Sequence, residues 1–174
     1  MSDGASYGEQ LLESARRNNT ELFQEIAAEF GENHEKLAAL INETKEVILA
    51  NSPLHIATSK GHWEFLDMVL DVEGVEIDPL NREGDTPLHL AVKFAAQEPD
   101  FGFFIVDNMI DAGSDVRIVD KHGLKPVNYV SDNEKLRALL ESAEYANGAE
   151  FQAGNGELAE DDDDEGSASD SDEQ

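Results

Sequence analysis

Five histidines give this chain its widest chemical repertoire, because imidazole both transfers protons near neutral pH and ligates metals. His55 and His89 occupy the same place in two similar segments, SPLHIA from Ser52 and TPLHLA from Thr86. A zinc site needs three or four converging ligands. Histidines in separate segments do not supply that set, and the chain has no Cys. We therefore predict no metal site and no cofactor.

Catalysis would require a nucleophile, a base and an orienting group that meet in one pocket. Serines, histidines and carboxylates are present, but each motif that contains a histidine has a structural explanation in the pattern described below. The stretch GNGELAEDDDD lacks the Lys and the following helix of a phosphate-binding loop. The sequence therefore predicts a protein that is not an enzyme.

The net charge of the chain is strongly negative. Its 174 residues include 39 Asp and Glu against 12 Lys and Arg, for a formal charge of -27. Nucleic acids and anionic membranes both select a basic surface, so direct binding to either is not expected. A protein partner, and a basic one, is favoured instead.

Composition also bears on the compartment. The absence of Cys rules out disulfides and suits a reducing environment. The first residues, MSDGASYGEQ, lack the basic start and apolar stretch of a secretory signal, and no run approaches the ~18 apolar residues of a membrane span. We expect a cytoplasmic and/or nuclear protein.

The body of the chain has the pattern of short helices separated by turns. EQLLESARRNN and TELFQEIAAEFG predict a helical hairpin, with Thr20 as the N-cap of its second helix and Gly31 as the stop. ENHEKLAALINE predicts one further helix, and LDVEGVEIDPLNREGD predicts an extended connector. Residues 148–174 contain 11 acids and neither Lys nor Arg, which predicts a disordered acidic tail.

Internal repetition is the strongest pattern. SPLHIA and TPLHLA are followed by a degraded copy, KPVNYV, from Lys125, and each copy precedes a second apolar helix. Pro53 and Pro87 suit the first turn of a helix, where a missing N–H costs nothing. Ser52 and Thr86 supply the hydroxyl of an N-cap. A stack of repeated helix pairs follows.

These motifs resemble the ankyrin repeat, a β-turn followed by an antiparallel helix pair with a T-P-L-H-x-A signature. The resemblance implies an all-α fold, a short ankyrin-repeat solenoid with a disordered tail. It covers residues 9–147: an atypical N-terminal repeat or cap at 9–50, repeats at 51–84 and 85–122, and a C-terminal capping repeat at 123–147. It also implies that His55 and His89 are structural and that Gly61-His62 joins two helices.

Ankyrin stacks bind partners through their turn tips and the concave face formed by the first helices. The resemblance therefore assigns contact roles to Arg82, Glu83, Lys121 and His122 at the tips, and to Ser59, Lys60, Lys93 and Phe94 on the helix side. We expect only a few of these residues to contribute much of the binding energy.

The second repeat departs from the family pattern, because KFAAQEPDFGF stands where a Gly-His turn is usual. We expect an enlarged loop at residues 94–103. Trp63 and Phe103 fall at matching positions and are predicted to pack. For Phe94, Phe101 and Phe104, partner contact and packing against this loop are both open.

EQLLESARRNNTELF, DPLNREGDTPLH and the acidic tail together resemble a group of small fungal ankyrin-repeat proteins. The layout alone is similar to the fungal ankyrin-repeat chaperone of a ribosomal protein. These observations predict a monomeric, non-enzymatic binding module that escorts a basic client, such as a ribosomal protein. The alternative is an inhibitor or adaptor that masks one partner through the concave face.

Overall fold

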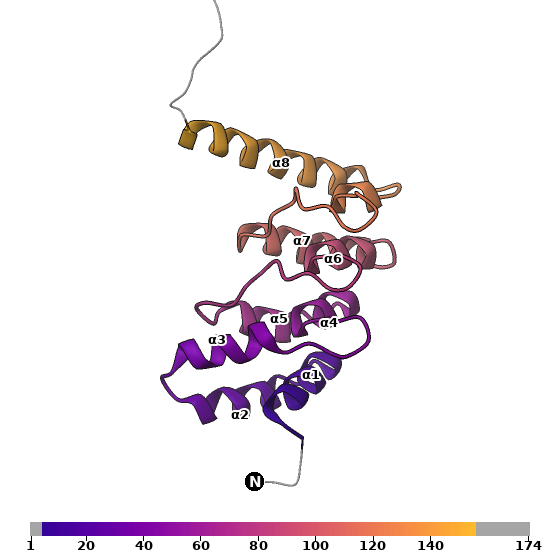
Figure 1. The fold of residues 1–174 in the computed structure, drawn as a ribbon. Helices are drawn as coiled ribbons and strands as arrows, with labels where there is room; N and C mark the ends of the chain where they lie inside the picture. Colours follow the sequence, from indigo (N-terminus) through magenta and orange to yellow (C-terminus); the bar gives the residue numbers. More distant parts are fainter. Residues whose placement is uncertain (1–4, 156–174) are drawn as a thin grey trace, which may run out of the picture. The chain divides into compact units, whose positions relative to one another are not determined.

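The computed structural model describes the backbone of residues 5–155 and the side chains of residues 5–148. Helices form the whole of the regular structure in this part of the chain, so the predicted all-α repeat fold is confirmed (Figure 1). In chain order they are α1 (Tyr7–Arg17), α2 (Thr20–Phe30), α3 (His34–Glu43), α4 (Pro53–Lys60), α5 (Trp63–Leu70), α6 (Pro87–Ala95), α7 (Pro99–Asp111), the short 3-10 helix η1 (Pro126–Tyr129) and α8 (Glu134–Asn155).

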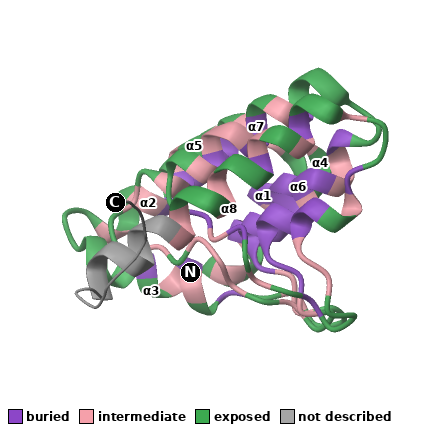
Figure 2. Ribbon diagram, turned by 90° about the horizontal axis from the view of Figure 1, so that it is seen from above, coloured by how far each residue is buried: buried purple, intermediate pink, exposed green. Residues whose placement is uncertain are grey.

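Three antiparallel helix pairs, α1 with α2, α4 with α5 and α6 with α7, stack in the order of the sequence. The first helices α1, α4 and α6 contact one another in turn and form the buried centre of the stack (Figure 2). Leu11, Leu54 and Leu88 are fully buried at matching positions of these helices. The second helices of the pairs, α2, α5 and α7, each bury one apolar face and expose the opposite face, as amphipathic surface helices do. We call them the outer helices, and α1, α4 and α6 the inner helices.

The chain divides into two compact units, residues 1–137 and residues 138–174. The first unit holds every helix from α1 to η1 together with the start of α8. The interaction surfaces described below lie in that first unit. Residues 148–155 of the predicted tail belong to α8, and residues 156–174 lie outside the described residues.

The predicted helix starts of the two central repeats are present. Pro53 and Pro87 are the first residues of α4 and α6, and the side chains of Ser52 and Thr86 accept hydrogen bonds from the N–H groups of His55 and His89. The start of α2 differs from the prediction, because Asn19 and not Thr20 is its N-cap and accepts from Leu22 N–H. Gly31 ends α2 as expected.

The enlarged loop expected at residues 94–103 is not formed. Only residues 96–98 separate α6 from α7, and the extra residues lengthen α7 to 13 residues, against 8 in α5. Pro99 starts the helix, and Gly102 lets it approach α6 closely, since a β-carbon there would lie 3.0 Å from the backbone nitrogen of Ala95 and overlap its Cα. Helix extension therefore absorbs the insertion.

Candidate interaction surface and its buried framework

His55 and His89 occupy the same position in the two repeat motifs, and each connects the start of its own helix to the next connector. Ser52 N–H donates to His55 Nδ1 at 3.0 Å, so Nε2 carries the proton and donates to the carbonyl of Asp85 at 2.7 Å. His89 repeats the pattern: Nδ1 accepts from Thr86 N–H at 3.0 Å, and Nε2 donates to the Leu124 carbonyl at 3.0 Å. Both rings are fully buried. They are framework residues that fix the spacing of successive connectors.

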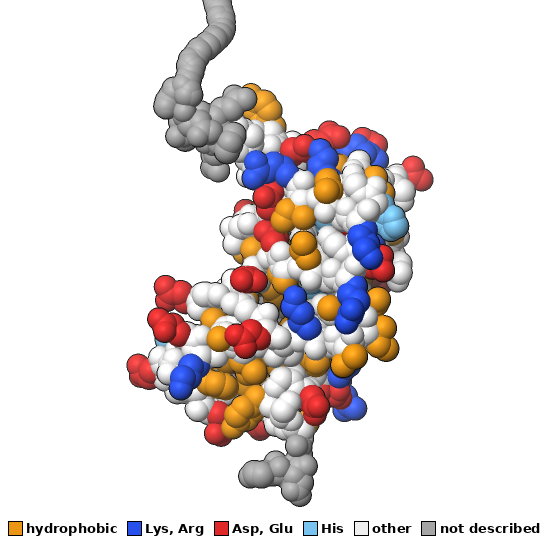
Figure 3. Space-filling model, viewed as in Figure 1, with side chains coloured by type: hydrophobic (Ala, Val, Ile, Leu, Met, Phe, Trp, Pro, Cys, Tyr) orange, Lys and Arg blue, Asp and Glu red, His pale blue; other side chains and the backbone are white. Residues whose placement is uncertain are grey.

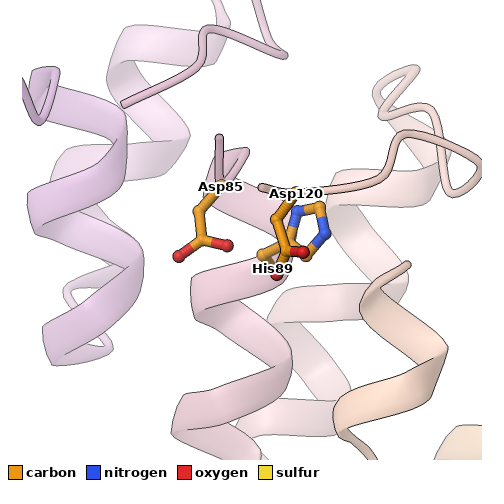
Figure 4. Close-up of side chains that lie close together, drawn as sticks. All are labelled: Asp85, His89 and Asp120. Atoms are coloured by element: carbon orange, nitrogen blue, oxygen red, sulfur yellow. The ribbon is translucent and has the colours of Figure 1, made fainter. Parts of the chain in front are cut away.

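His89 also belongs to the one group of described residues whose donor atoms are close enough to hold a metal ion. Asp85, His89 and Asp120 place one donor atom each within 4.8 Å of the others, at the start of α6 (Figure 4). Both His89 nitrogens are occupied, however, and Asp120 accepts from Tyr129 O–H and from the N–H groups of His122 and Leu124. Asp85 pairs with Lys93 through Oδ2 at 3.1 Å, while its Oδ1 is buried without a hydrogen-bond partner in the described structure. The cluster is thus a network in which most of the donor atoms are already engaged by groups of the protein.

The same network sets the protonation of its members. Burial opposes ionisation of Asp120, but the donated hydrogen bonds of Tyr129, Leu124 and His122 outweigh it and lower its pKa to about 2. The reciprocal hydrogen bond to Asp120 raises the pKa of Tyr129 to about 12. Burial lowers the pKa of His55 to about 4, so its ring is neutral at pH 7. None of these groups is poised for proton transfer near neutral pH.

The connectors form a row of turns that are held by side-chain acceptors. Asn81 Oδ1 accepts from the N–H groups of Glu83 and Asp85, and Asp120 Oδ1 does the same for its own turn. Neighbouring turns bond to each other, since Lys121 N–H donates to the carbonyl of Glu83 at 3.0 Å. The predicted contact residues at the tips, Arg82, Glu83, Lys121 and His122, are all exposed on this row.

Sequence reasoning missed the first turn of the row. Glu46 accepts from the N–H groups of Ile48, Leu49 and Asn51, and the turn presents Val47 and Ile48 with 82% and 77% of their surface exposed. The signal was available: three consecutive aliphatic residues, outside any helical pattern, precede SPLHIA at the place where the later connectors carry charged tips.

The predicted residues on the inner helices differ in their availability. Ser59 and Lys60 are exposed at the end of α4, although Ser59 Oγ donates to its own helix at Ile56. Lys93 is half-buried, pairs with Asp85 and lies 4.4 Å from the ring centre of Tyr129. Its charge is therefore engaged within the molecule.

The three phenylalanines for which packing or contact was left open form one row with Trp63. Phe94 meets Phe101 edge to face at 6.1 Å, Phe101 stacks on Phe104 at 5.9 Å with ring planes 9° apart, and Phe104 meets Trp63 at 5.1 Å. We call these four side chains the aromatic row. Trp63 and Phe94 are half-buried, whereas Phe101 and Phe104 remain 39% and 42% exposed. The row lies where α4 turns into α5 and α6 into α7.

Charge is separated between the two helix layers. The outer helices α2, α5 and α7 contain eight acidic residues and neither Lys nor Arg, whereas the inner helices contain two acids and four bases. Seven of the eight outer acids are exposed, and Asp107 is half-buried. Within residues 5–148 no ion pair neutralises any of the eight. In Figure 3, Asp and Glu predominate around α2, α3 and α5 at the left, whereas Lys and Arg are more frequent along the connectors at the right and at the top near the start of α8.

No helix within residues 5–155 combines the length and apolar character that crossing a bilayer requires. The exposed features of the described first unit include the tips, the aliphatic turn at residues 47–49, the aromatic row and the acidic outer layer.

Comparison with known proteins agrees with the geometry. The family model for ankyrin repeats, in three copies, matches residues 11–99. An ankyrin repeat-containing protein of Saccharomyces cerevisiae is 43% identical over 167 residues, which cover 91% of this chain and 92% of that protein. Alpha-latroinsectotoxin-Lt1a of Latrodectus tredecimguttatus is 31% identical over 102 residues, 58% of this chain but 7% of the toxin. The repeat motifs, the stacked helix pairs and these matches lead to one conclusion: the chain belongs to the ankyrin repeat family.

Proposed function

We propose that this protein escorts a basic client protein, which it holds through the acidic layer of its outer helices. Ankyrin repeats are protein–protein interaction modules, generally without enzymatic activity. The observation that carries the proposal is the outer layer itself: eight carboxylates on α2, α5 and α7 without a single cation among them. A surface of one sign selects partners of the other and speeds their encounter.

The acidic C-terminal sequence adds to this selection. Residues 156–174 contain ten further acids and neither Lys nor Arg. Together with the outer layer they would cover the basic surface of a client that otherwise binds nucleic acid, until assembly releases it. In the absence of a client, the net charge of -27 would favour solubility of the free protein.

The experiment compares full-length protein with two charge variants. One replaces an exposed acid on each outer helix, Glu25→Gln, Asp67→Asn and Asp111→Asn. The matched control removes the same charge elsewhere, at three exposed acids of α1 and around the start of α8, Glu9→Gln, Asp132→Asn and Glu134→Gln. Affinity purification with mass spectrometry, at low and high salt, should recover basic proteins whose yield falls at high salt and falls further in the first variant than in the control. Recovery of neutral or acidic partners, indifferent to salt, would contradict the proposal.

The contribution of the tail needs a truncation that leaves α8 whole. Removing residues 156–174, after the last residue of α8, retains every described helix. We expect weaker capture of the basic client, because the removed charges act at long range. Capture that is unchanged would leave the outer layer as the sole determinant.

A second function, an adaptor or inhibitor that masks one partner through the concave face, has its own supporting observation. The inner helices carry four bases, of which Arg16, Arg17 and Lys93 form ion pairs within the molecule and Lys60 is exposed. Arg82 and Lys121 are exposed at the tips. A partner seated there would be acidic or neutral. Arg82→Ala with Lys121→Ala would then abolish capture, while the outer-layer variant would not.

A further inference from the structure

The aromatic row offers exposed ring faces beside carboxylates that form no ion pair within residues 5–148. Phe101 and Phe104 are three residues apart on α7 and stack with nearly parallel planes. Phenylalanine side chains are usually buried in folded proteins. Two adjacent rings that are 39% and 42% exposed therefore form an apolar surface patch of the kind that binds a partner.

Carboxylates flank this patch on both helices. Asp100 lies four residues before Phe104 and Asp107 three residues after it, so all three share one face of α7. On α5, Asp67 lies four residues after Trp63, whose ring meets Phe104. Asp100 and Asp67 are exposed, and Asp107 is half-buried. Neither α5 nor α7 carries a base, although Lys135 of α8 lines the same surface hollow as Asp100.

Aromatic faces with adjacent carboxylates are the chemistry that recognises a cation. A guanidinium stacks flat on a phenyl ring while its N–H groups reach a carboxylate, and an ammonium does so less well because it is compact and strongly hydrated. The chain already contains a contact between a cation and a ring of α7: Nζ of Lys135, on α8, lies 5.0 Å from the ring centre of Phe103.

We propose that the aromatic row is the docking site for arginine side chains of a basic segment, with Phe101 and Phe104 as the stacking platform and Asp100 and Asp67 as the charge partners. This inference rests on the proposed function and specifies it. The outer layer attracts basic segments in general, and the aromatic row selects arginine over lysine among them.

The test uses four synthetic peptides of one length, built on a Gly/Ser backbone. The first carries evenly spaced Arg, the second carries Lys at the same positions, the third carries neither, and the fourth carries Leu at those positions. Binding to the full-length protein is measured by fluorescence anisotropy at low salt. We expect both basic peptides to bind, and the Arg peptide to bind about three- to fivefold more tightly than the Lys peptide.

Three variants identify the source of that preference. Phe101→Leu with Phe104→Leu keeps apolar bulk but removes the ring faces, and should reduce the Arg to Lys ratio to about 1 while Lys binding stays. Asp100→Asn should weaken both peptides equally. Tyr145→Ala removes an aromatic side chain that is 80% exposed and is not part of the row, and should change neither. Circular dichroism melting checks that each variant is folded.

The possible failures are distinguishable. If wild-type protein binds the two basic peptides equally, or if the Leu variant retains the preference for Arg, the arginine site is overturned and the proposed function stands. If neither basic peptide binds better than the Gly/Ser peptide, the proposed function itself is overturned. Tighter binding of the fourth peptide, with Leu in place of Arg, would show that the row is an apolar docking site and would also overturn the inference.

Discussion

The ring of Phe94 lies directly against Gly61, the residue that joins α4 to α5 in the preceding repeat. A β-carbon on Gly61 would overlap the tip of this ring and lie 2.8 Å from Cε1. Gly61 also has φ +70, a left-handed conformation that disfavours any side chain. The contact explains why Phe94 is half-buried, and it locates one end of the aromatic row on a rigid turn.

Gly61→Ala should therefore destabilise the protein through two separable effects. We expect a loss of about 2–3 kcal/mol in the free energy of unfolding, from the left-handed conformation and from displacement of the Phe94 ring. Gly123→Ala is the matched control, because Gly123 has φ +76 and a β-carbon there would meet nothing within 4 Å. It should cost about 1 kcal/mol. Urea denaturation measures both.

A double-mutant cycle isolates the part of this loss in the free energy of unfolding that comes from the clash with the Phe94 ring. Phe94→Leu shortens the side chain, so Gly61→Ala should cost less in that background, with a coupling of about 1 kcal/mol. Additive effects would mean that the ring yields without cost and that the turn conformation alone explains the loss.

The buried ring of His55 predicts a loss of stability in mild acid. Burial lowers its pKa from 6.5 to about 4, so the unfolded chain takes up a proton at higher pH than the folded protein does. The stabilisation is complete above pH 6.5 and is lost as the pH falls toward 4. On that basis His55 contributes about 3 kcal/mol to the change in the free energy of unfolding across this interval.

His55→Asn removes this titration while supplying an acceptor for the helix start. The third repeat copy already uses Asn128 in this way, since its Oδ1 accepts from Lys125 N–H at 2.8 Å. The variant should be less stable at pH 7, because the hydrogen bond to Asp85 is lost, but its stability should change less between pH 6.5 and 4. His122→Asn, at an exposed tip, is the control and should retain the slope of the wild-type protein. Equal slopes in all three proteins would assign the acid sensitivity to other groups.

The repeat motifs were sufficient to predict the stacked pairs and the framework role of His55 and His89, because a periodic signature fixes each helix start. The missing Gly-His turn of the second repeat predicts a loop for its extra residues, whereas the structure adds them to α7. Pro99 was the overlooked signal, since proline favours the first turn of a helix. The capping error at the start of α2 arose from two adjacent residues, Asn19 and Thr20, that are both good caps.

Side-chain relationships across helices were beyond the sequence. Nothing in the spacing of Phe94, Phe101 and Phe104 shows that they align with Trp63, because that row depends on how α7 packs on α5 and α6. The separation of charge, by contrast, is readable from the sequence once the helix pairs are assigned, because the second helix of each pair lacks Lys and Arg.

The titration of Asp78 should lower the free energy of unfolding as the pH rises, whereas that of His55 should raise it. Burial raises its pKa from 3.8 to about 6, although the N–H of Asp115 donates to Oδ2, and Oδ1 is buried without a partner in the described structure. Because the folded protein binds this proton more tightly than the unfolded chain, ionisation costs stability as the pH rises from about 4 to about 6.

Asp78→Asn removes that cost and keeps an acceptor for Asp115. Relative to wild type, the variant should gain about 1–2 kcal/mol between pH 4 and pH 7, a figure reduced for the partial exposure of the side chain. Denaturation at the two pH values gives this difference. Glu73→Gln, an exposed acid of the same connector, should show no such gain. A difference that is constant with pH would show that Asp78 ionises normally.

The carboxylate of Glu46 is expected to hold the aliphatic turn at residues 47–49 in place, because it accepts backbone hydrogen bonds from the turn. Burial disfavours its charge, yet the N–H groups of Ile48, Leu49 and Asn51 hold its pKa below the usual value, which shows that the carboxylate form organises the turn. Glu46→Gln replaces one acceptor oxygen with a donor that would face an N–H. We expect a loss of about 1 kcal/mol in local stability, seen as about fivefold faster hydrogen exchange at these three amides. Glu43→Gln, exposed at the end of α3, should leave their exchange unchanged. Exchange that is equally slow in both variants would mean that the bond from Arg82 N–H to the Leu49 carbonyl, at 2.8 Å, suffices to hold the turn.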